Sequence, residues 1–415
     1  MNAAGSPAPV TVDASPGEAG LDDPRLRDLR ARARGYVDAG HLPGVVTVVA
    51  RHGRVALADA YGQRDVERGL PMSTDTIFRV YSMTKPVVSA ALLRLYEQGA
   101  FLLEDPVGRY LPEFAGQRVL ADPASGRTVA AQRPVTVLDL LRHTSGLAPL
   151  TGRSPVTALY RQHGLADPDG QLDLAESVRR LAGLPLAAQP GQRWIYGVST
   201  DVAGRLCEVL SGEPLDAYLA RTVLAPLGMT DTGFMVAPGQ AGRLAANYGP
   251  GEDDGPRLRL LDDPATSRYV TGRRYLSGSQ GLVSTAADYL RFCWMLLGRG
   301  RLGEARVLGP RTVDLMMLNQ LPGGADISAM GADGGETRTP GHGFGLGGAV
   351  LVDRARAEIS ATPGEFSWGG AASTAFFISP RDDLAVLFLT QLRPSKTYQR
   401  LRRELRAIAY AALTD

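Results

Sequence analysis

Strand-like apolar runs lie near both ends of this chain, and a long stretch of helical patterning separates them. Residues 45–50 and 55–61 are predicted to form a β-hairpin, because the turn-forming sequence RHGR joins them. Further apolar runs come only near the other end, at 345–352, 371–378 and 384–392. These runs are continuous rather than alternating, which is typical of a sheet covered on both faces. The pattern therefore predicts one sheet built from both ends of the chain.

Helical periodicity predicts the covers of this sheet and the structure between its two halves. Amphipathic segments at 22–40 and 396–413 are expected to pack on the sheet. In the middle of the chain the same periodicity predicts five helices, at 87–98, 137–142, 172–181, 200–210 and 215–224.

The order of these elements predicts the domain organisation. We expect an α/β domain formed by residues 22–80 and 275–415, with a mainly helical domain, 81–274, inserted in it. Residues 1–21 are rich in Ala, Gly, Ser and Pro and lack the basic and apolar regions of a signal peptide. We expect them to form a disordered leader.

The composition indicates a globular protein with room for two domains: 415 residues, of which 44% are hydrophobic and 21% charged. The formal net charge of +2 is too small for an electrostatic nucleic-acid or acidic-membrane interface, and no apolar run is long enough to span a bilayer. Cys207 and Cys293 have no metal-ligand spacing and cannot build a disulfide framework, which favours a reducing, cytoplasmic location. We expect no metal and no cofactor, and the sequence leaves the oligomeric state open.

The segment YSMTKP, residues 81–86, is the first candidate for chemistry. Ser82 and Lys85 are three residues apart at the start of a predicted helix, so the amine can reach the hydroxyl. The eight residues after Lys85 carry no charge, and both burial and the helix dipole favour the neutral amine, a general base for the serine. Only Lys85 and Lys396 are lysines among 45 basic residues, and Arg stays protonated. The alternative is a helix cap beside a surface charge, since Ser-x-x-Lys is frequent by chance.

Two further segments are candidates for what a phenol or a backbone N–H can contribute. Tyr196 lies on a predicted loop before a helix, where its phenol can shuttle a proton if Ser82 is near. Taken alone, this pattern favours a packed aromatic residue. The segment FSWGGA, residues 366–371, leads into a predicted strand, and its paired glycines allow a backbone N–H to bind an oxyanion; an ordinary strand bulge is the alternative. His143, in the sequence HTSG, is predicted to end a helix.

Five separated blocks occur in this order along the chain: FRVYSMTK (78–85), HTSGL (143–147), PLGMT (226–230), GLVST (281–285) and WGG (368–370). Together they resemble the serine β-lactamase and penicillin-binding-protein superfamily, in particular the class C-like family VIII carboxylesterases. The resemblance covers most of the chain. It implies an antiparallel sheet flanked by the N-terminal and C-terminal helices, an inserted helical domain, and an active site at the domain interface.

The resemblance also implies a role for each candidate residue. Ser82 attacks an acyl carbonyl, while Lys85 and Tyr196 manage its proton. The backbone N–H groups of Ser82 and Ala371 form the oxyanion hole, and water then resolves the acyl-enzyme. The substrate site is expected to be lined by Trp368, Gly369 and Gly370.

Two departures from the family pattern favour neutral esters as substrates. In the family pattern, class C β-lactamases have a Tyr-x-Asn motif. At the position of the Asn this chain has Val198, which cannot hydrogen-bond the side-chain amide of a β-lactam. Their Lys-Thr-Gly motif is replaced by Trp368-Gly369-Gly370, and an indole in place of a cation favours a neutral, apolar substrate. The Trp-Gly-Gly pattern also resembles the acyltransferases related to lovastatin synthesis, in which an alcohol accepts the acyl group.

The sequence therefore predicts a serine carboxylesterase that cleaves small neutral esters through an acyl-Ser82 intermediate. Acyl transfer to a small alcohol or amine is the second hypothesis. A β-lactamase-like or DD-peptidase-like enzyme and a non-catalytic binding protein are further alternatives. The chain has no G-x-S-x-G elbow, which excludes the α/β-hydrolase route to an esterase.

Overall fold

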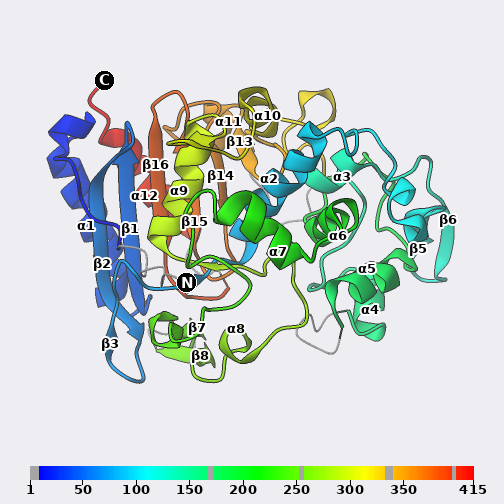
Figure 1. Ribbon diagram of the computed structural model, residues 1–415, viewed down its shortest axis with the longest axis horizontal. Coiled ribbons are helices and arrows are strands. Elements are labelled where there is room, and N and C mark those ends of the chain that lie inside the picture. Colours follow the sequence, from blue (N-terminus) through cyan, green and yellow to red (C-terminus); the bar gives the residue numbers. More distant parts are fainter. Residues whose placement is uncertain (1–8, 166–171, 252–256, 332–339, 395–398) are drawn as a thin grey trace.

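A large antiparallel sheet organises the protein, as a computed structural model of residues 9–165, 172–251, 257–331, 340–394 and 399–415 shows (Figure 1). Its eight strands lie in the order β12-β13-β14-β15-β16-β1-β2-β3. They are β1 Gly44–Arg51, β2 Arg54–Asp65, β3 Leu70–Pro71, β12 His342–Phe344, β13 Ala349–Leu351, β14 Phe366–Gly369, β15 Ala375–Ser379 and β16 Leu384–Leu389.

Helices and short hairpins make up the rest of the described chain. The α-helices are α1 Asp23–Asp38, α2 Thr84–Glu97, α3 Val137–Leu141, α4 Pro155–Gln162, α5 Leu174–Ala182, α6 Ser199–Ser211, α7 Leu215–Leu219, α8 Arg268–Thr271, α9 Ala286–Leu297, α10 Pro310–Met316, α11 Arg354–Ala357 and α12 Gln399–Ala411. The two-stranded sheets are β4 Phe78–Arg79 with β9 Val283–Ser284, β5 Arg118–Asp122 with β6 Arg127–Ala130, β7 Asn247–Pro250 with β8 Leu258–Asp262, and β10 Arg301–Leu302 with β11 Ala305–Arg306.

Strands from the two ends of the chain are neighbours within the main sheet. Val48 of β1 pairs with Ala58 of β2 on one side and with Leu387 of β16 on the other, both antiparallel. The prediction of one sheet assembled from both chain ends is therefore confirmed, and with it the predicted fold class.

Helices cover both faces of this sheet. On one face, Val45 and Val49 of β1 share a core with apolar residues of α1 and α12. Their neighbours Val46 and Val48 point to the other face and join the larger core, which includes α2 and α9. Figure 1 shows α1 (blue) and α12 (red) on the side of the sheet away from the cyan and green helices α3–α6. Because both faces are covered, every residue of β1 is buried, which explains its continuous apolar sequence.

The regular elements between β3 and α9 are mostly helices, as predicted, but the hairpins β5–β6 and β7–β8 also lie there. The division into an α/β domain and an inserted helical domain, 81–274, stays a prediction. None of the described helices is long and apolar enough to cross a membrane.

Two predicted strands have the wrong bounds. Residues 345–348 form a turn between β12 and β13, closed by a hydrogen bond of 2.8 Å from Gly345 N–H to Gly348 O, so 345–352 is not one strand. The run 371–378 also begins too early, because β15 starts at Ala375. Residues 366–369 of the segment FSWGGA, which was expected to lead into this strand, form the strand β14 themselves, and the turn follows β14. Gly347, with φ 102°, permits the first turn, and Ser373, with φ 69°, takes the left-handed backbone in the second; hydrophobicity alone reveals neither turn.

The prediction of a disordered leader over 1–21 is wrong for residues 9–21. The N–H group of Asp13 donates to Val55 O at 3.1 Å, and Ala19 and Leu21 are buried in the core beneath α1 and α12. A few small apolar side chains at suitable intervals are enough to pack this Ala-rich and Pro-rich segment on β2. Residues 1–8 lie outside the described part of the chain.

Candidate active site

Ser82 lies in a single 3₁₀ turn, Tyr81–Met83, directly before α2. The residues before this turn are hydrogen-bonded to a neighbouring segment, because β4 pairs with β9 and Val80 N–H donates to Leu282 O at 3.1 Å. Tyr81 has a left-handed backbone, with φ 43°, which is strained for a bulky residue and typical of functional sites. The GLVST block therefore supports the turn that presents Ser82.

Lys85 lies in the first turn of α2 and is only 3% exposed. Its burial follows from the helix, in which 11 of the 14 residues are buried. Lys85 Nζ is 3.2 Å from Ser82 Oγ, donates to Ser279 O at 2.9 Å, and lies 4.5 Å from the centre of the Tyr196 ring. The structure thus brings Ser82, Lys85 and Tyr196 together, although Lys85 faces the ring of the tyrosine rather than its hydroxyl.

Tyr196 belongs to a cluster of aromatic side chains with Trp194, Trp368 and His143, called the aromatic wall below. Its ring stacks on Trp194 with centres 5.8 Å apart and meets Trp368 at 5.2 Å and His143 at 5.0 Å. The Trp368 indole N–H donates to the Tyr196 hydroxyl oxygen at 3.0 Å. Because this bond uses the oxygen as an acceptor, the phenolic proton is available to a second partner.

The loop that carries Tyr196 is held by the HTSG loop. His143 has φ 59° directly after the last turn of α3, which confirms that it ends this helix. Its carbonyl oxygen accepts a hydrogen bond of 2.9 Å from Ile195 N–H. Gly197 fits here only because it has no side chain, since a Cβ would lie 2.4 Å from Leu147 O. The two loops therefore pack backbone against backbone.

The His143 side chain is neutral and buried against this wall. Burial holds the pKa of His143 well below its ordinary value. The rings of Trp194, Tyr196 and Phe344 surround it, with ring centres 5.0 to 6.1 Å away. His143 therefore contributes no positive charge beside Lys85.

The Trp-Gly-Gly segment reaches the Ser82 turn from the main sheet. Trp368 and Gly369 end β14, and Gly370 begins the turn to β15. A Cβ on Gly370 would lie 2.4 Å from Val80 O, so only glycine allows this approach. Within the described part of the chain, no hydrogen bond uses the N–H groups of Ser82 or Ala371. Two unused backbone donors therefore lie on adjoining segments.

Val198, where class C β-lactamases have a polar residue, is 5% exposed and belongs to the main core.

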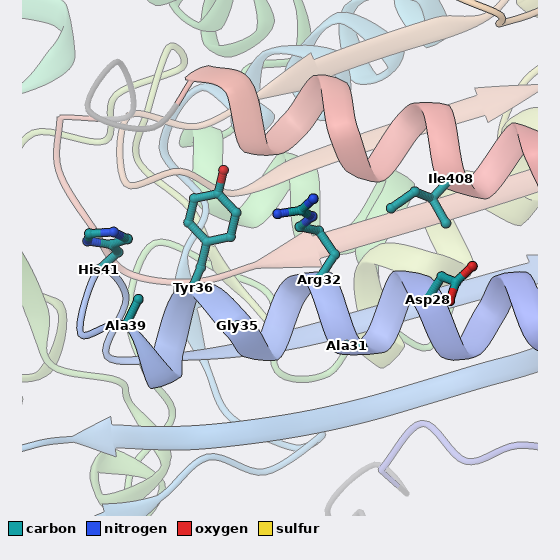
Figure 2. A pocket seen from close by; sticks show the side chains of 8 residues that line it. All are labelled: Asp28, Ala31, Arg32, Gly35, Tyr36, Ala39, His41 and Ile408. Carbon is teal, nitrogen blue, oxygen red and sulfur yellow. The ribbon is translucent and has the colours of Figure 1, made fainter.

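A groove elsewhere on the molecule lies between α1 and α12 (Figure 2). It shares no residue with the Ser82 cluster and lies in the helical layer on the other face of the sheet. Its lining residues are Asp28, Ala31, Arg32, Gly35, Tyr36, Ala39, His41 and Ile408.

An antiparallel sheet between terminal and central helices, with Ser and Lys three residues apart at the start of a buried helix, defines a protein of the β-lactamase class. The chain belongs to the Beta-lactamase family, whose family model matches residues 29–411. Esterase EstB from Burkholderia gladioli is 36% identical over 404 residues, which cover 92% of this chain and 93% of EstB. The resemblance inferred from the sequence is confirmed.

Two solved structures agree with this assignment. EstCE1, described as a hydrolase with promiscuous acyltransferase activity, has a TM-score of 0.79 and 29% identity, covering 93% of this chain and 98% of EstCE1. Simvastatin synthase (LovD) from Aspergillus terreus has a TM-score of 0.77 and 27% identity, with the same coverage of 93% and 98%.

The sequence reasoning missed the carbonyl group of Ser279, which accepts the hydrogen bond from Lys85. A backbone acceptor has no residue-type signal, so no motif search finds it. The only hint is the run of small residues at 277–279, one residue before the GLVST block, which permits a tight turn.

Proposed function

We propose that this protein is a serine carboxylesterase that hydrolyses small neutral acyl esters through an acyl-Ser82 intermediate. The observation that carries the proposal is the 3.2 Å separation of Lys85 Nζ and Ser82 Oγ. An amine at hydrogen-bond distance can take the proton of a hydroxyl as its oxygen attacks. The similarity to Esterase EstB supports the same reaction.

The proposed acylation step uses four residues of the chain. Ser82 Oγ bonds to the acyl carbon as its proton passes to the neutral amine of Lys85. The carbonyl electron pair moves to oxygen, where the N–H groups of Ser82 and Ala371 stabilise it. On collapse, the bond to the alcohol oxygen breaks, and the alcohol leaves with the proton that Lys85 took from Ser82, delivered directly or through the Tyr196 hydroxyl. Water then attacks the acyl-enzyme, which releases the acid and restores Ser82.

The apolar surroundings support a neutral substrate. Trp368 is half-buried, and its ring packs edge-on against Phe344 with centres 5.2 Å apart. An aromatic surface at this position attracts acyl and alkyl groups and offers a carboxylate no charge partner.

The cytoplasmic location stays part of the proposal, supported by the two buried free thiols of Cys207 and Cys293.

The nucleophile is tested with a fluorophosphonate probe and a panel of p-nitrophenyl esters from acetate to octanoate. We expect turnover of the shorter esters and a single covalent adduct, found by mass spectrometry on the peptide that contains Ser82. Ser82→Ala is the matched control, and it should neither react nor turn over. An adduct on another peptide, or no turnover of any ester, would contradict the proposal.

Gly370→Ala tests the proposed oxyanion hole. The new Cβ would meet Val80 O at 2.4 Å, so the turn that carries the Ala371 N–H must move away from Ser82. We expect kcat to fall by about 10²-fold, the usual cost of one lost oxyanion donor. Gly35→Ala in α1 is the control, because neither Gly35 nor Gly370 has a left-handed backbone and no atom lies within 4 Å of the new Cβ at Gly35. Unchanged kcat in Gly370→Ala would remove Ala371 from the proposal.

Acyl transfer is the second candidate function, favoured by the likeness to EstCE1 and to simvastatin synthase. The acyl-Ser82 intermediate is common to both reactions, and the acceptor decides between them. Product analysis with one acyl donor, in water alone and with added small alcohols or amines, separates the two. Esterase function predicts free acid as the main product at every acceptor concentration, whereas transferase function predicts that the acyl-acceptor product dominates.

A further inference from the structure

The loop that supplies the acceptor for Lys85 is packed tightly on the first turn of α6. Gly278 touches this helix so closely that a Cβ would lie 2.4 Å from Thr200 O. Ser277 O accepts a hydrogen bond of 2.9 Å from Gly281 N–H, which closes the loop on itself. The position of the Ser279 carbonyl group is therefore set by α6, the helix that follows the Tyr196 loop.

Asp201 is the polar anchor of this loop. It lies in the first turn of α6 and is 2% exposed. Its carboxylate accepts hydrogen bonds from Ser277 Oγ at 2.7 Å and from Ser279 N–H at 3.2 Å. A buried carboxylate is costly unless hydrogen bonds satisfy it, and here Ser277 and Ser279 provide them.

We propose that Asp201 is a positioning residue for proton transfer from Ser82, acting through residues 277–279. Asp201 holds Ser279 by its N–H group, and the carbonyl group of Ser279 holds Lys85 Nζ at 2.9 Å. This inference rests on the proposed function, because it assigns Asp201 to the base that activates Ser82.

The chemistry of a lysine base explains why such an anchor is needed. A neutral amine has two N–H bonds and one lone pair, and the lone pair must point at the serine proton. The side chain has a flexible four-carbon stem, so a fixed acceptor is required to set the rotation of the amine. With one N–H directed at the Ser279 carbonyl oxygen, the lone pair can face Ser82 Oγ, 3.2 Å away. A misplacement of about 1 Å at such a group can cost ~10²-fold in rate.

Asp201→Asn tests the inference, because the amide keeps the shape but presents N–H groups to a set of donors. We expect kcat to fall ~10- to 100-fold with little change in KM, and the rate of fluorophosphonate reaction at Ser82 to fall by the same factor. The matched control is Asp105→Asn. Asp105 is 8% exposed and, like Asp201, accepts hydrogen bonds from a hydroxyl, that of Tyr110 (2.6 Å), and from a backbone N–H, that of Leu102 (2.8 Å), but it follows the far end of α2.

A residue with only a structural role makes a different prediction. Its substitution lowers the melting temperature and the fraction of active sites, but leaves the rate per active site unchanged. Fluorophosphonate titration counts the active sites, and the measured rate is divided by that count. We expect that pattern for Asp105→Asn and a lowered rate per site for Asp201→Asn. An unchanged rate per site in Asp201→Asn overturns the inference.

Ser277→Ala extends the test to a milder change. It removes one donor to Asp201 and is expected to lower kcat by ~3- to 10-fold. If both residues act through the same loop, the double variant should be no slower than Asp201→Asn alone. Fully additive losses contradict the inference, and if Asp201→Asn does not fold, Ser277→Ala alone decides it by the same rate per site.

The two lysines of the chain allow a readout that does not depend on turnover. In protein made with isotope-labelled lysine, NMR shows the side chains of Lys85 and Lys396, and Lys85→Arg assigns them. We expect Asp201→Asn to shift the Lys85 signal and Asp105→Asn to leave it in place. An unmoved Lys85 signal overturns the inference while the esterase proposal stands. A wild-type protein whose Ser82 never reacts overturns the esterase proposal instead, and the NMR comparison then still decides whether Asp201 positions Lys85.

Discussion

Lys85→Arg is expected to lower kcat/KM for a p-nitrophenyl ester by ~10³- to 10⁴-fold, because the loss removes general-base catalysis at the nucleophile. Arginine keeps the hydrogen-bond donors but stays protonated, so it cannot accept the Ser82 proton. Steady-state kinetics and the rate of fluorophosphonate reaction at Ser82 should fall together. Wild-type turnover by Lys85→Arg would rule out the amine as the base.

Two variants make this comparison sharp. Lys396→Arg makes the same chemical change at the other lysine of the chain, which lies outside the described residues and is expected from the sequence to be a replaceable surface charge. Full activity is therefore expected. Lys85→Met removes the amine but fits the 3% exposed position without a charge, so it should be inactive yet folded. If Lys85→Arg unfolds because the guanidinium is too large, Lys85→Met still tests the base, with circular dichroism to confirm the fold.

The sheet could be predicted from the sequence, whereas its turns could not. A strand such as β1, buried at every position, has a continuous apolar sequence that hydrophobicity detects directly. The turn at 345–348 lies inside an equally apolar run, and only the glycines permit it. The packing of residues 9–21 depends on contacts with β2, which neighbouring residues in the sequence do not encode.

The candidate site divides in the same way. Ser82 and Lys85 are close because helix geometry brings residues three apart onto one face, a local rule that applies before the fold is known. Asp201 and Ser279 are 78 residues apart, and their hydrogen bond follows only from the packing of a loop on α6. The sequence indicated Tyr196 and the segment of Trp368, and the resemblance to known enzymes gave them roles, but neither predicted the hydrogen bond between them across 172 residues.

Tyr196→Phe is expected to lower kcat by ~10²-fold for an ester with a poor leaving group, because the proposed proton donor to the departing alcohol is lost. The phenyl ring keeps its place among Trp194, His143 and Trp368, so the aromatic wall stays packed. A p-nitrophenyl ester needs little protonation of its leaving group and should lose much less. The measurement is therefore the ratio of rates for an ethyl and a p-nitrophenyl ester of the same acid.

Trp368→Phe provides the graded comparison for this prediction. It removes the indole N–H that donates to the Tyr196 oxygen at 3.0 Å but keeps an aromatic ring, so a loss of ~3- to 10-fold is expected. Because this N–H acts only through the phenol, the double variant should be no slower than Tyr196→Phe. Tyr218→Phe is the control, since that buried hydroxyl donates to Ala91 O at 3.1 Å and its loss should affect stability alone. Equal losses on both esters in Tyr196→Phe would show that the tyrosine shapes the site without delivering the proton.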